Sequence, residues 1–400
     1  MSDTANSKRV AAPGARRAAA AGVVLMLTQL AAPAYAGPNE QAKRIYERIA
    51  GVPPTATDVQ YLQTNCISGG TLNLQCAAQY ATSAPTFYSV TLKNWVMPWT
   101  NRNQTVFAPF NDYAATVIGM VRDDVPFNTA LSADLLYTLK TAGLPAPSSA
   151  NNNHYAAAET QGVNLMTDLV STTQSATYGI PVAATAGLIT TRGAASAFFI
   201  NGTNRAMFRF TMINHFCNDM PTLMDITRPS DRIRQDVARS PGGDSRIFLN
   251  NCVGCHSGMD PMAQAFAYYN FNATTGAMVY TQGQVQPKNL INAANFPFGF
   301  VTPDDSWSNR WRTGPNAALG WSGSLPGSGN GAKSLGQELA SSATFAQCQV
   351  TKVFQAVCFR APVDTADLAT VAAMTASFTG SGGYKLKAMF QQAAAACPGT

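Results

Sequence analysis

Two cysteines and a histidine within five residues are the strongest chemical signal in this sequence. The stretch NNCVGCHSGMDP (250–261) places Cys252 three residues before Cys255, and His256 follows at once. Such a pair of thiols can attach a haem covalently, bind a structural zinc ion, act as a redox dithiol or close a disulfide. The compartment of the protein and the other ligands in the chain decide among these four possibilities.

The first 36 residues have the features of a secretory signal peptide. A basic start precedes the apolar run AAAAGVVLMLTQLAAPA, and the small residues Ala34 and Ala36 form the pattern that signal peptidase recognises. We expect export by the ordinary unfolded route, cleavage after Ala36, and a periplasmic or secreted mature protein. The apolar run is too short for an anchor, and no later run approaches the roughly 18 apolar residues that span a bilayer.

The charge of the chain gives no reason to expect a nucleic acid partner. Only 12% of the residues are charged, and the formal net charge is +6. Residues 1–36 hold four of the 27 basic residues and one of the 21 acidic ones, which leaves a net charge of +3 without them. This small excess provides no extended basic surface for phosphates. The remaining 364 of the 400 residues are enough for a large core.

The six cysteines outside the motif are expected to form disulfides, because export leads to an oxidising compartment. Residues 345–358 have helical periodicity, and ten helical residues separate Cys348 from Cys358 by about 15 Å. A disulfide needs Cα atoms within about 7 Å, so these two cannot pair with each other. Cys66 and Cys76 flank a Gly-Gly loop, and we predict that they pair. Cys217 and Cys397 then pair with Cys348 and Cys358 in either order, unless some of the six are buried free thiols.

The motif itself favours a covalent haem. Two thiols at this spacing add to the two vinyl groups of a haem c, and the adjacent histidine becomes the proximal iron ligand. Zinc needs four ligands, usually in two separated pairs, whereas the chain holds only three histidines and no second C-x-x-C. Upstream, Asp244 is a candidate N-cap of a helix that runs into Cys252, which is not the strand-to-helix context of a redox dithiol. Downstream, we expect Asp260 to cap a new helix with Pro261 in its first turn.

The stretch CVGCHSGMDPMAQAF (252–266) resembles the C-x-x-C-H-x-x-M-D-P segment of large exported mono-haem cytochrome c-like proteins, found in planctomycetes and other Gram-negative bacteria. Residues 44–62 are similar to their N-terminal helix–turn–helix, residues 187–217 to the part that carries an Arg-Gly pair, and residues 335–362 to their C-terminal helical unit. The resemblance implies a mostly helical exported cytochrome that depends on haem-maturation machinery. It implies no reaction, because the role of the family is largely undefined. The chain departs from the pattern at YYNFNATTG (268–276) and in a Trp-rich insert (296–325).

The sixth iron ligand separates an electron carrier from an enzyme. A Met or His in that position closes the iron for electron transfer, whereas an open position allows peroxide or oxygen chemistry. Met278 and His215 are the candidate distal ligands, although each could instead be a structural residue of the core. Met259 lies too close to His256 along the chain to reach the opposite face of the haem. His154, in an Asn-rich stretch, is expected in a surface loop or helix cap.

Five arginines precede the motif, in residues 228–246. Haem propionates are carboxylates, and arginine binds carboxylates with two parallel hydrogen bonds. Arg239 and Arg246 are the candidate propionate ligands. Alternatively, the segment is a solvated helix whose aspartates balance the charge, or a docking patch for an acidic redox partner.

These observations predict a mainly α fold: a helical exported protein with an embedded cytochrome c-like haem unit and a loop-rich insert. The expected regions are the signal peptide (1–36), an N-terminal helical region (37–225), the haem region with the insert (226–334), and a C-terminal unit of two helices (335–400), the second capped by Asp364. The predicted function is one-electron transfer to a redox partner protein by a single haem c, with no nucleic acid and no membrane span. The alternatives are a haem enzyme of the peroxidase or oxidase kind with an open distal site, and an interaction protein in which the haem is structural.

Overall fold

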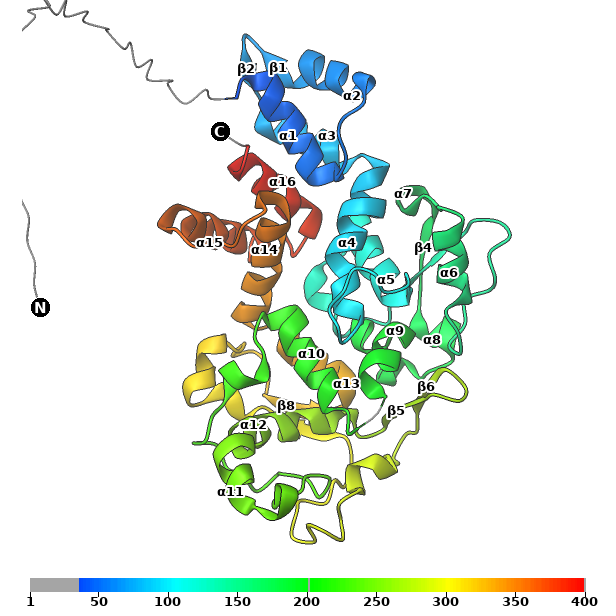
Figure 1. Ribbon diagram of the computed structural model, residues 1–400, viewed down its shortest axis with the longest axis vertical. Coiled ribbons are helices and arrows are strands. Elements are labelled where there is room, and N and C mark those ends of the chain that lie inside the picture. The colour runs from blue at the N-terminus through cyan, green and yellow to red at the C-terminus, as the bar shows by residue number, and fades with distance from the viewer. Residues whose placement is uncertain (1–35, 201, 399–400) are drawn as a thin grey trace, which may run out of the picture. The chain divides into compact units, whose positions relative to one another are not determined.

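Helices form most of the protein, as predicted, and strands occur only in short pairs. The computed structural model describes residues 36–200 and 202–398, and Figure 1 shows how their elements are arranged. Each of the four sheets within these residues consists of two antiparallel strands. The predicted signal peptide falls outside the described residues except for Ala36. Within the described ranges no helix is both long and apolar enough to cross a membrane.

The predicted helix–turn–helix near the N-terminus is present. Helix α1 (Pro38–Ala50) starts with a proline in its first turn and ends at Gly51 in the left-handed conformation, with φ of 74°. Helix α2 (Ala56–Tyr61) starts with a capping box between Thr55 and Asp58. After the short pair β1 (Ile67–Ser68) and β2 (Thr71–Leu72), helix α3 (Leu74–Thr82) packs against α1.

The C-terminal part contains four helices where two were predicted. They are α13 (Gly331–Ala340), α14 (Ala343–Cys358), α15 (Thr365–Thr379) and α16 (Leu386–Ala396). Asp364 caps α15 as predicted, by accepting a hydrogen bond from the backbone N–H of Asp367. The extra boundaries arise because Ser342 caps α14 anew after α13 ends, and because a glycine-rich turn ends α15 before Leu386. Helix α16 packs on α3, α14 and α1, so the first and the last of the described helices lie together (Figure 1).

Two buried helices cross the middle of the protein. Helix α5 (Asp112–Arg122) is buried along nearly its whole length, and α10 (Arg205–Phe216) packs against α14 and α12. The region was predicted as mainly helical, and one short strand pair interrupts it: β3 (Leu136–Leu139) pairs with β4 (Leu169–Thr172) beside α5. The shorter helices here are α4 (Lys93–Val96), α6 (Asn153–Thr160), α7 (Leu165–Asp168), α8 (Gln174–Tyr178) and α9 (Arg192–Ala194).

Three disulfides join the helical parts. Cys66 pairs with Cys76, which confirms that prediction. The open choice among the other four is resolved: Cys217 pairs with Cys348, and Cys358 pairs with Cys397, with Cα atoms 5.5 Å and 5.7 Å apart. Cys348 and Cys358 indeed lie on one helix and do not pair with each other. The two long-range bridges tie α14 to the end of α10 and to the end of α16.

One continuous hydrophobic core runs through the described chain. It extends from Ala42 to Cys397 and takes residues from all three of the predicted regions 37–225, 226–334 and 335–400. A second, small cluster consists of Ile233, Val237 and Phe248, with Cys252 and Val253 packed against it. The segment that carries the cysteine pair therefore lies between the main core and a small cluster of its own.

The cysteine pair lies on a nearly continuous helical stretch. Asp244 caps α11 (Ser245–Ile247) as predicted, a single π-helical turn (Phe248–Cys252) follows, and α12 (Val253–Ala263) continues the helix. The expected new helix at Asp260 is wrong, because α12 runs through Pro261. The Asp260 carboxylate does not cap a helix end because it pairs with Arg205 from α10. After Phe266 the chain forms β5 (Tyr269–Asn272), which pairs with β6 (Ala277–Tyr280). Strand β5 replaces the end of the helix that was predicted to start at Pro261.

The arginine-rich segment 228–246 is not a solvated helix, so that alternative is wrong. It consists mainly of turns, and Arg234 forms an isolated bridge with Phe300. Two of its three aspartates pair with arginines far away in the chain, Asp231 with Arg310 and Asp236 with Arg205. The third, Asp244, pairs with Arg246 two residues further on. The following region is rich in loops, as predicted. Its only strands within the described residues are β7 (Ser306–Ser308) and β8 (Ser328–Asn330), which pair with each other.

The inner face of α12 is fixed by Trp311 from this loop-rich region. Trp311 is fully buried, and its indole lies directly over Gly258. A Cβ atom added to Gly258 would lie 1.9 Å from Nε1 of Trp311, so only glycine allows this close approach. The rest of the inner face is held by Ser257, whose hydroxyl donates to the carbonyl of Asp225.

We expect the variant Cys217→Ser/Cys348→Ser to lose about 5 kcal/mol in free energy of unfolding, since the bridge closes a long loop in the unfolded chain. The variant Cys66→Ser/Cys76→Ser, which opens a ten-residue separation, should lose only about 3 kcal/mol. Urea denaturation of the oxidised proteins measures both losses. Equal losses, or reactive thiols at these four positions in the folded wild type, would contradict the assigned pairing.

We also expect Gly258→Ala to destabilise the protein by about 2 kcal/mol or more, because overpacking against Trp311 outweighs the roughly 1 kcal/mol that alanine gains in a helix. Gly254→Ala, on the same helix, is the control. Its added Cβ would meet the flexible end of the Met224 side chain at 3.2 Å, so its stability should change little. Thermal unfolding of both variants measures the difference, and a Gly258→Ala protein as stable as wild type would refute the contact.

Candidate functional site

Cys252, Cys255 and His256 lie on one stripe of the helical stretch. Residues three and four apart on a helix share a face, and all three side chains are partly exposed. Cys252 and Cys255 are free thiols, whereas the other six cysteines are all paired. Burial raises the pKa of the Cys255 thiol, whose sulfur lies 3.5 Å from the carbonyl oxygen of Met220. Two free thiols and an imidazole thus lie together on the partly exposed face of this helical stretch.

These side chains do not form a zinc site by themselves. Within residues 36–200 and 202–398, no group of three or more His, Cys, Asp and Glu side chains is placed to hold a metal ion. A structural zinc ion needs four such ligands in a tetrahedral arrangement. The zinc interpretation of the motif therefore lacks the other ligands that it requires.

His256 is oriented by a carboxylate one helical turn further on. Its Nδ1 lies 3.1 Å from both carboxylate oxygens of Asp260, and the His256 side chain is 18% exposed. A carboxylate only accepts hydrogen bonds, so Nδ1 of His256 carries a proton. The ring of Phe248 lies beside the imidazole, with 6.3 Å between centroids. The nitrogen left available for a ligand is Nε2.

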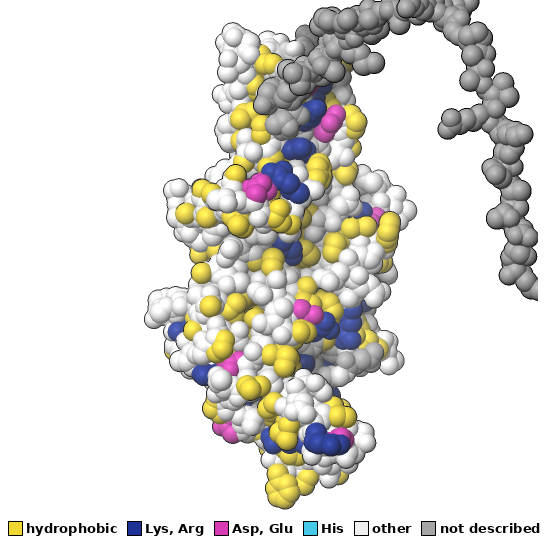
Figure 2. All heavy atoms as spheres, turned by 60° about the vertical axis from the view of Figure 1, so that its left-hand side comes forward, with side chains coloured by type: hydrophobic (Ala, Val, Ile, Leu, Met, Phe, Trp, Pro, Cys, Tyr) yellow, Lys and Arg dark blue, Asp and Glu magenta, His cyan; other side chains and the backbone are white. Residues whose placement is uncertain are grey.

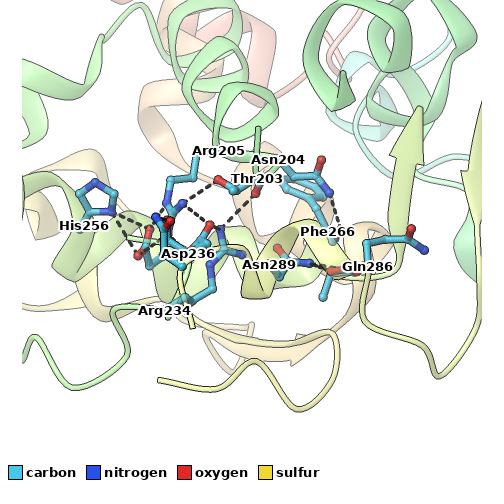
Figure 3. A network of polar contacts seen from close by, with 12 residues as sticks. Thr203, Asn204, Arg205, Arg234, Asp236, His256, Phe266, Gln286 and Asn289 are labelled. Atoms are coloured by element: carbon cyan, nitrogen blue, oxygen red, sulfur yellow. Dashed lines mark hydrogen bonds and ion pairs between the residues drawn. The ribbon is translucent and has the colours of Figure 1, made fainter. Parts of the chain in front are cut away.

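Asp260 belongs to a buried ion network with Arg205, Asp236 and Arg234, and Figure 3 labels these three partners. Arg205 donates to both oxygens of Asp260 at 2.6 Å and 2.8 Å, and to both oxygens of Asp236 at 2.5 Å and 2.7 Å. Neither aspartate side chain has any exposed surface. Burial alone would raise the pKa of Asp260, but the charges of Arg205 and His256 hold that pKa well below its ordinary value. The network therefore favours the ionised form of the Asp260 carboxylate.

Arg234 is the member of this network whose hydrogen bonds are incomplete. It is 1% exposed, and its Nη2 donates to the carbonyl of Thr203 at 3.1 Å and to Asp236 at 3.4 Å. Its Nε and Nη1 are buried and have no hydrogen-bond partner among residues 36–200 and 202–398. A buried donor without a partner costs about 1–3 kcal/mol, so this guanidinium is suited to a further acceptor. Sequence reasoning did not single out Arg234, because burial alone distinguishes it from the other arginines of the segment.

The two arginines predicted to bind propionates differ in their surroundings. Arg239 lies over the rings of Phe248 and Phe296, at 5.3 Å and 4.5 Å, and its Nε is buried without a partner. Arg246 has an 82% exposed side chain and is already paired with Asp244. Arg239 therefore has an Nε donor available close to Phe248, whose ring lies beside that of His256. The donors of Arg246 face Asp244 and solvent.

The two candidate distal ligands make their contacts elsewhere. His215 is buried in α10, where its Nε2 lies 2.9 Å from the hydroxyl of Tyr113 and its Nδ1 lies 3.5 Å from the amide nitrogen of Gln349. Burial and the nearby Lys352 hold the pKa of His215 well below its ordinary value. Met278 lies in β6, opposite Phe271, and packs against the main core. The structure thus brings Arg239 near the motif through Phe248, and it shows neither distal candidate in contact with His256.

His154 is not in a surface loop, so that expectation is wrong. It lies in α6 and is 3% exposed. Its Nε2 accepts a hydrogen bond from the backbone N–H of Leu139 at 3.0 Å, and its Nδ1 donates to the carbonyl of Pro145 at 2.7 Å. Both ring nitrogens are used to hold a loop against β3. The asparagines that precede His154 in the sequence indicated an exposed loop, and no local signal indicated this buried role.

Exposed apolar side chains gather around the motif. Figure 2 shows apolar and basic side chains side by side at the lower end of the face it presents, where Figure 1 places α11 and its neighbouring loops. Met224 and Ile226 lie against Gly254, between the two cysteines, and Leu249 precedes Cys252 with 60% of its surface exposed. Such uncovered apolar surface is suited to an apolar ligand or to a partner. The exposed apolar residues of this part are Met224, Ile226, Ile247, Leu249, Leu290, Ile291, Phe298 and Val301.

Comparisons of the chain with protein-family models, with curated proteins and with solved structures found no match. The resemblance of residues 252–266 to large exported cytochrome c-like proteins therefore stays a prediction. What this site does must follow from its own residues and their contacts.

Proposed function

We propose that the protein is an exported c-type cytochrome that holds one covalent haem and transfers single electrons. The observation that carries the proposal is the state of the cysteines. Six of them are paired in three disulfides, whereas Cys252 and Cys255 are free, on one partly exposed face with His256. A haem c needs two free thiols at this spacing and a histidine beside them.

Each residue of the site has a distinct role in this proposal. The sulfur atoms of Cys252 and Cys255 each form a thioether bond with a vinyl group, and the thiol hydrogens pass to the other vinyl carbons. Nε2 of His256 binds the iron, because Nδ1 is already committed to Asp260. When bound, the haem supplies a one-electron couple between ferric and ferrous iron.

The buried arginine donors are a second observation that supports the proposal. Nε and Nη1 of Arg234 and Nε of Arg239 have no partner among the described residues. Ile233, the neighbour of Arg234, belongs to the small apolar cluster that also contacts Cys252. A propionate carboxylate would supply the acceptors that these donors lack. Arg234 and Arg239 therefore fit this role better than Arg246, which is paired with Asp244.

The exposed apolar surface around the motif is suited to a redox partner protein. Apolar contact surface surrounded by charged groups is typical of protein interfaces, and the charged rim steers the encounter. Here the exposed arginine of the segment, Arg246, lies next to the exposed Ile247 and Leu249. The same segment would thus hold the haem and meet the partner.

A haem enzyme with an open distal position is the second candidate. The observation that favours it is the commitment of His215 to Tyr113 and Gln349, and of Met278 to the β5–β6 pair. An iron with no protein ligand opposite His256 binds peroxide or oxygen, whereas one with two protein ligands only exchanges electrons.

The first test is covalent attachment. We expect protein produced in the periplasm together with haem-maturation machinery to keep its haem after denaturation, and Cys252→Ser/Cys255→Ser to lose it. The control is Cys66→Ser/Cys76→Ser, which also removes two cysteines but takes them from a disulfide outside the motif, and it should keep the haem. Absorption spectra of the denatured proteins measure this. A wild type without covalent haem would refute the proposed function.

The second test is the coordination of the iron. Since His215 and Met278 make their contacts away from α12, we expect His215→Phe and Met278→Leu to leave the spectrum of the haem protein unchanged. A low-spin iron that does not bind carbon monoxide would support the electron carrier. A high-spin iron that binds carbon monoxide would support the enzyme instead, and loss of a low-spin spectrum in either variant would identify that residue as the distal ligand.

A further inference from the structure

We propose that Asp260 is a positioning residue that fixes the ring of His256 through Nδ1 and makes Nε2 a stronger electron donor to the iron. The consequence is a lower reduction potential than a neutral acceptor on Nδ1 would give. This inference rests on the proposed function, since it concerns how the chain tunes the iron that His256 holds.

The spacing of the two residues on α12 sets the geometry of their contact. Both oxygens of Asp260 lie 3.1 Å from Nδ1 of His256, and the two residues are one turn apart on α12. Residues four apart on a helix lie on the same face, so the pairing needs no movement of the backbone. The imidazole therefore meets the iron in an orientation that α12 has already set.

The acceptor is a carboxylate that cannot turn away. Arg205 holds both oxygens of Asp260 with two parallel hydrogen bonds, and the side chain has no exposed surface. A bidentate pair of this kind fixes the plane of the carboxylate as well as its position. Asp260 thus has two tasks, to pair with Arg205 and to accept the proton of His256.

A carboxylate acceptor increases the basicity of a metal-binding histidine. Negative charge shared through Nδ1 stabilises ferric iron more than ferrous iron, because the ferric ion carries one more positive charge. The effect persists at this site because water does not reach the carboxylate, and charges interact more strongly where water is excluded. Arg205 opposes the effect in part, but its charge is divided between Asp260 and Asp236.

Asp236 provides a matched control. It is as buried as Asp260, it pairs with the same guanidinium through two hydrogen bonds of similar length, and its other ionic contact is Arg234. Its contacts do not include His256. Replacing either aspartate removes one carboxylate from Arg205, but only replacement of Asp260 changes the acceptor of the imidazole.

The experiment compares Asp260→Asn with Asp236→Asn in the haem-loaded protein by redox titration. We expect Asp260→Asn to raise the ratio of reduced to oxidised protein at least tenfold at a fixed potential, which corresponds to an upward shift of about 59 mV for one electron. Asp236→Asn should change this ratio less than threefold. Equal shifts in the two variants, or no shift in Asp260→Asn, would overturn the inference.

A second measurement uses the haem-free protein with Cys252→Ser/Cys255→Ser, in case either substitution weakens folding of the loaded protein. Nitrogen NMR of His256 should show a protonated Nδ1 in this background and in its Asp236→Asn derivative, and a mixture of tautomers after Asp260→Asn. An unchanged tautomer after Asp260→Asn would refute the positioning role. A failure of the proposed function can be distinguished from a failure of this inference. In that case the wild type would take up no covalent haem, while the NMR result would still show Nδ1 protonated.

Discussion

The double ion pair of Arg205 is the interaction on which the arrangement around the motif depends. One guanidinium from α10 meets Asp236 from the arginine-rich segment and Asp260 from α12, both without exposed surface. Removing one partner of a buried charge pair leaves the other uncompensated, at a cost of about 3–5 kcal/mol. These three parts of the chain therefore cannot separate without exposing or isolating a charge. The position of His256 follows from this constraint, since its ring is anchored to one of the two carboxylates.

The two faces of α12 are built by different physical means. The inner face is packed, with Gly258 under Trp311 and Ser257 bonded to Asp225. The outer face is polar and partly open, with both thiols and the imidazole exposed to some extent. A helix presents reactive groups reproducibly only when its other face is immobile. A large chain around a short motif is consistent with this division, because the core supplies the rigid side and leaves the reactive side free.

Local signals in the sequence predicted local structure correctly. The caps at Asp244 and Asp364, the helix that carries Cys348 and Cys358, and the Cys66–Cys76 loop all depend on residues close together in the chain. Some of the errors arose at residues that have a distant partner. Asp260 before Pro261 has the pattern of a helix start, but Arg205 claims its carboxylate, and α12 continues. Likewise the choice between Cys348 and Cys358 as partner of Cys217 depends on how α10 packs against α14, which no spacing along the chain encodes.

The same limit explains why the cysteine pair was recognisable and its surroundings were not. The proposed covalent haem requires a fixed spacing of two thiols and a histidine, and this spacing is visible in consecutive residues of the sequence. The groups that would tune that haem are Asp260, Arg205 and Arg234, and the last two become neighbours of the motif only in the folded chain. The unpartnered donors of Arg234 and Arg239 raise the free energy of the protein without a ligand. An anionic group that accepted hydrogen bonds from these donors would recover this free energy. Binding of such a group at the motif would therefore stabilise the segment that holds these arginines.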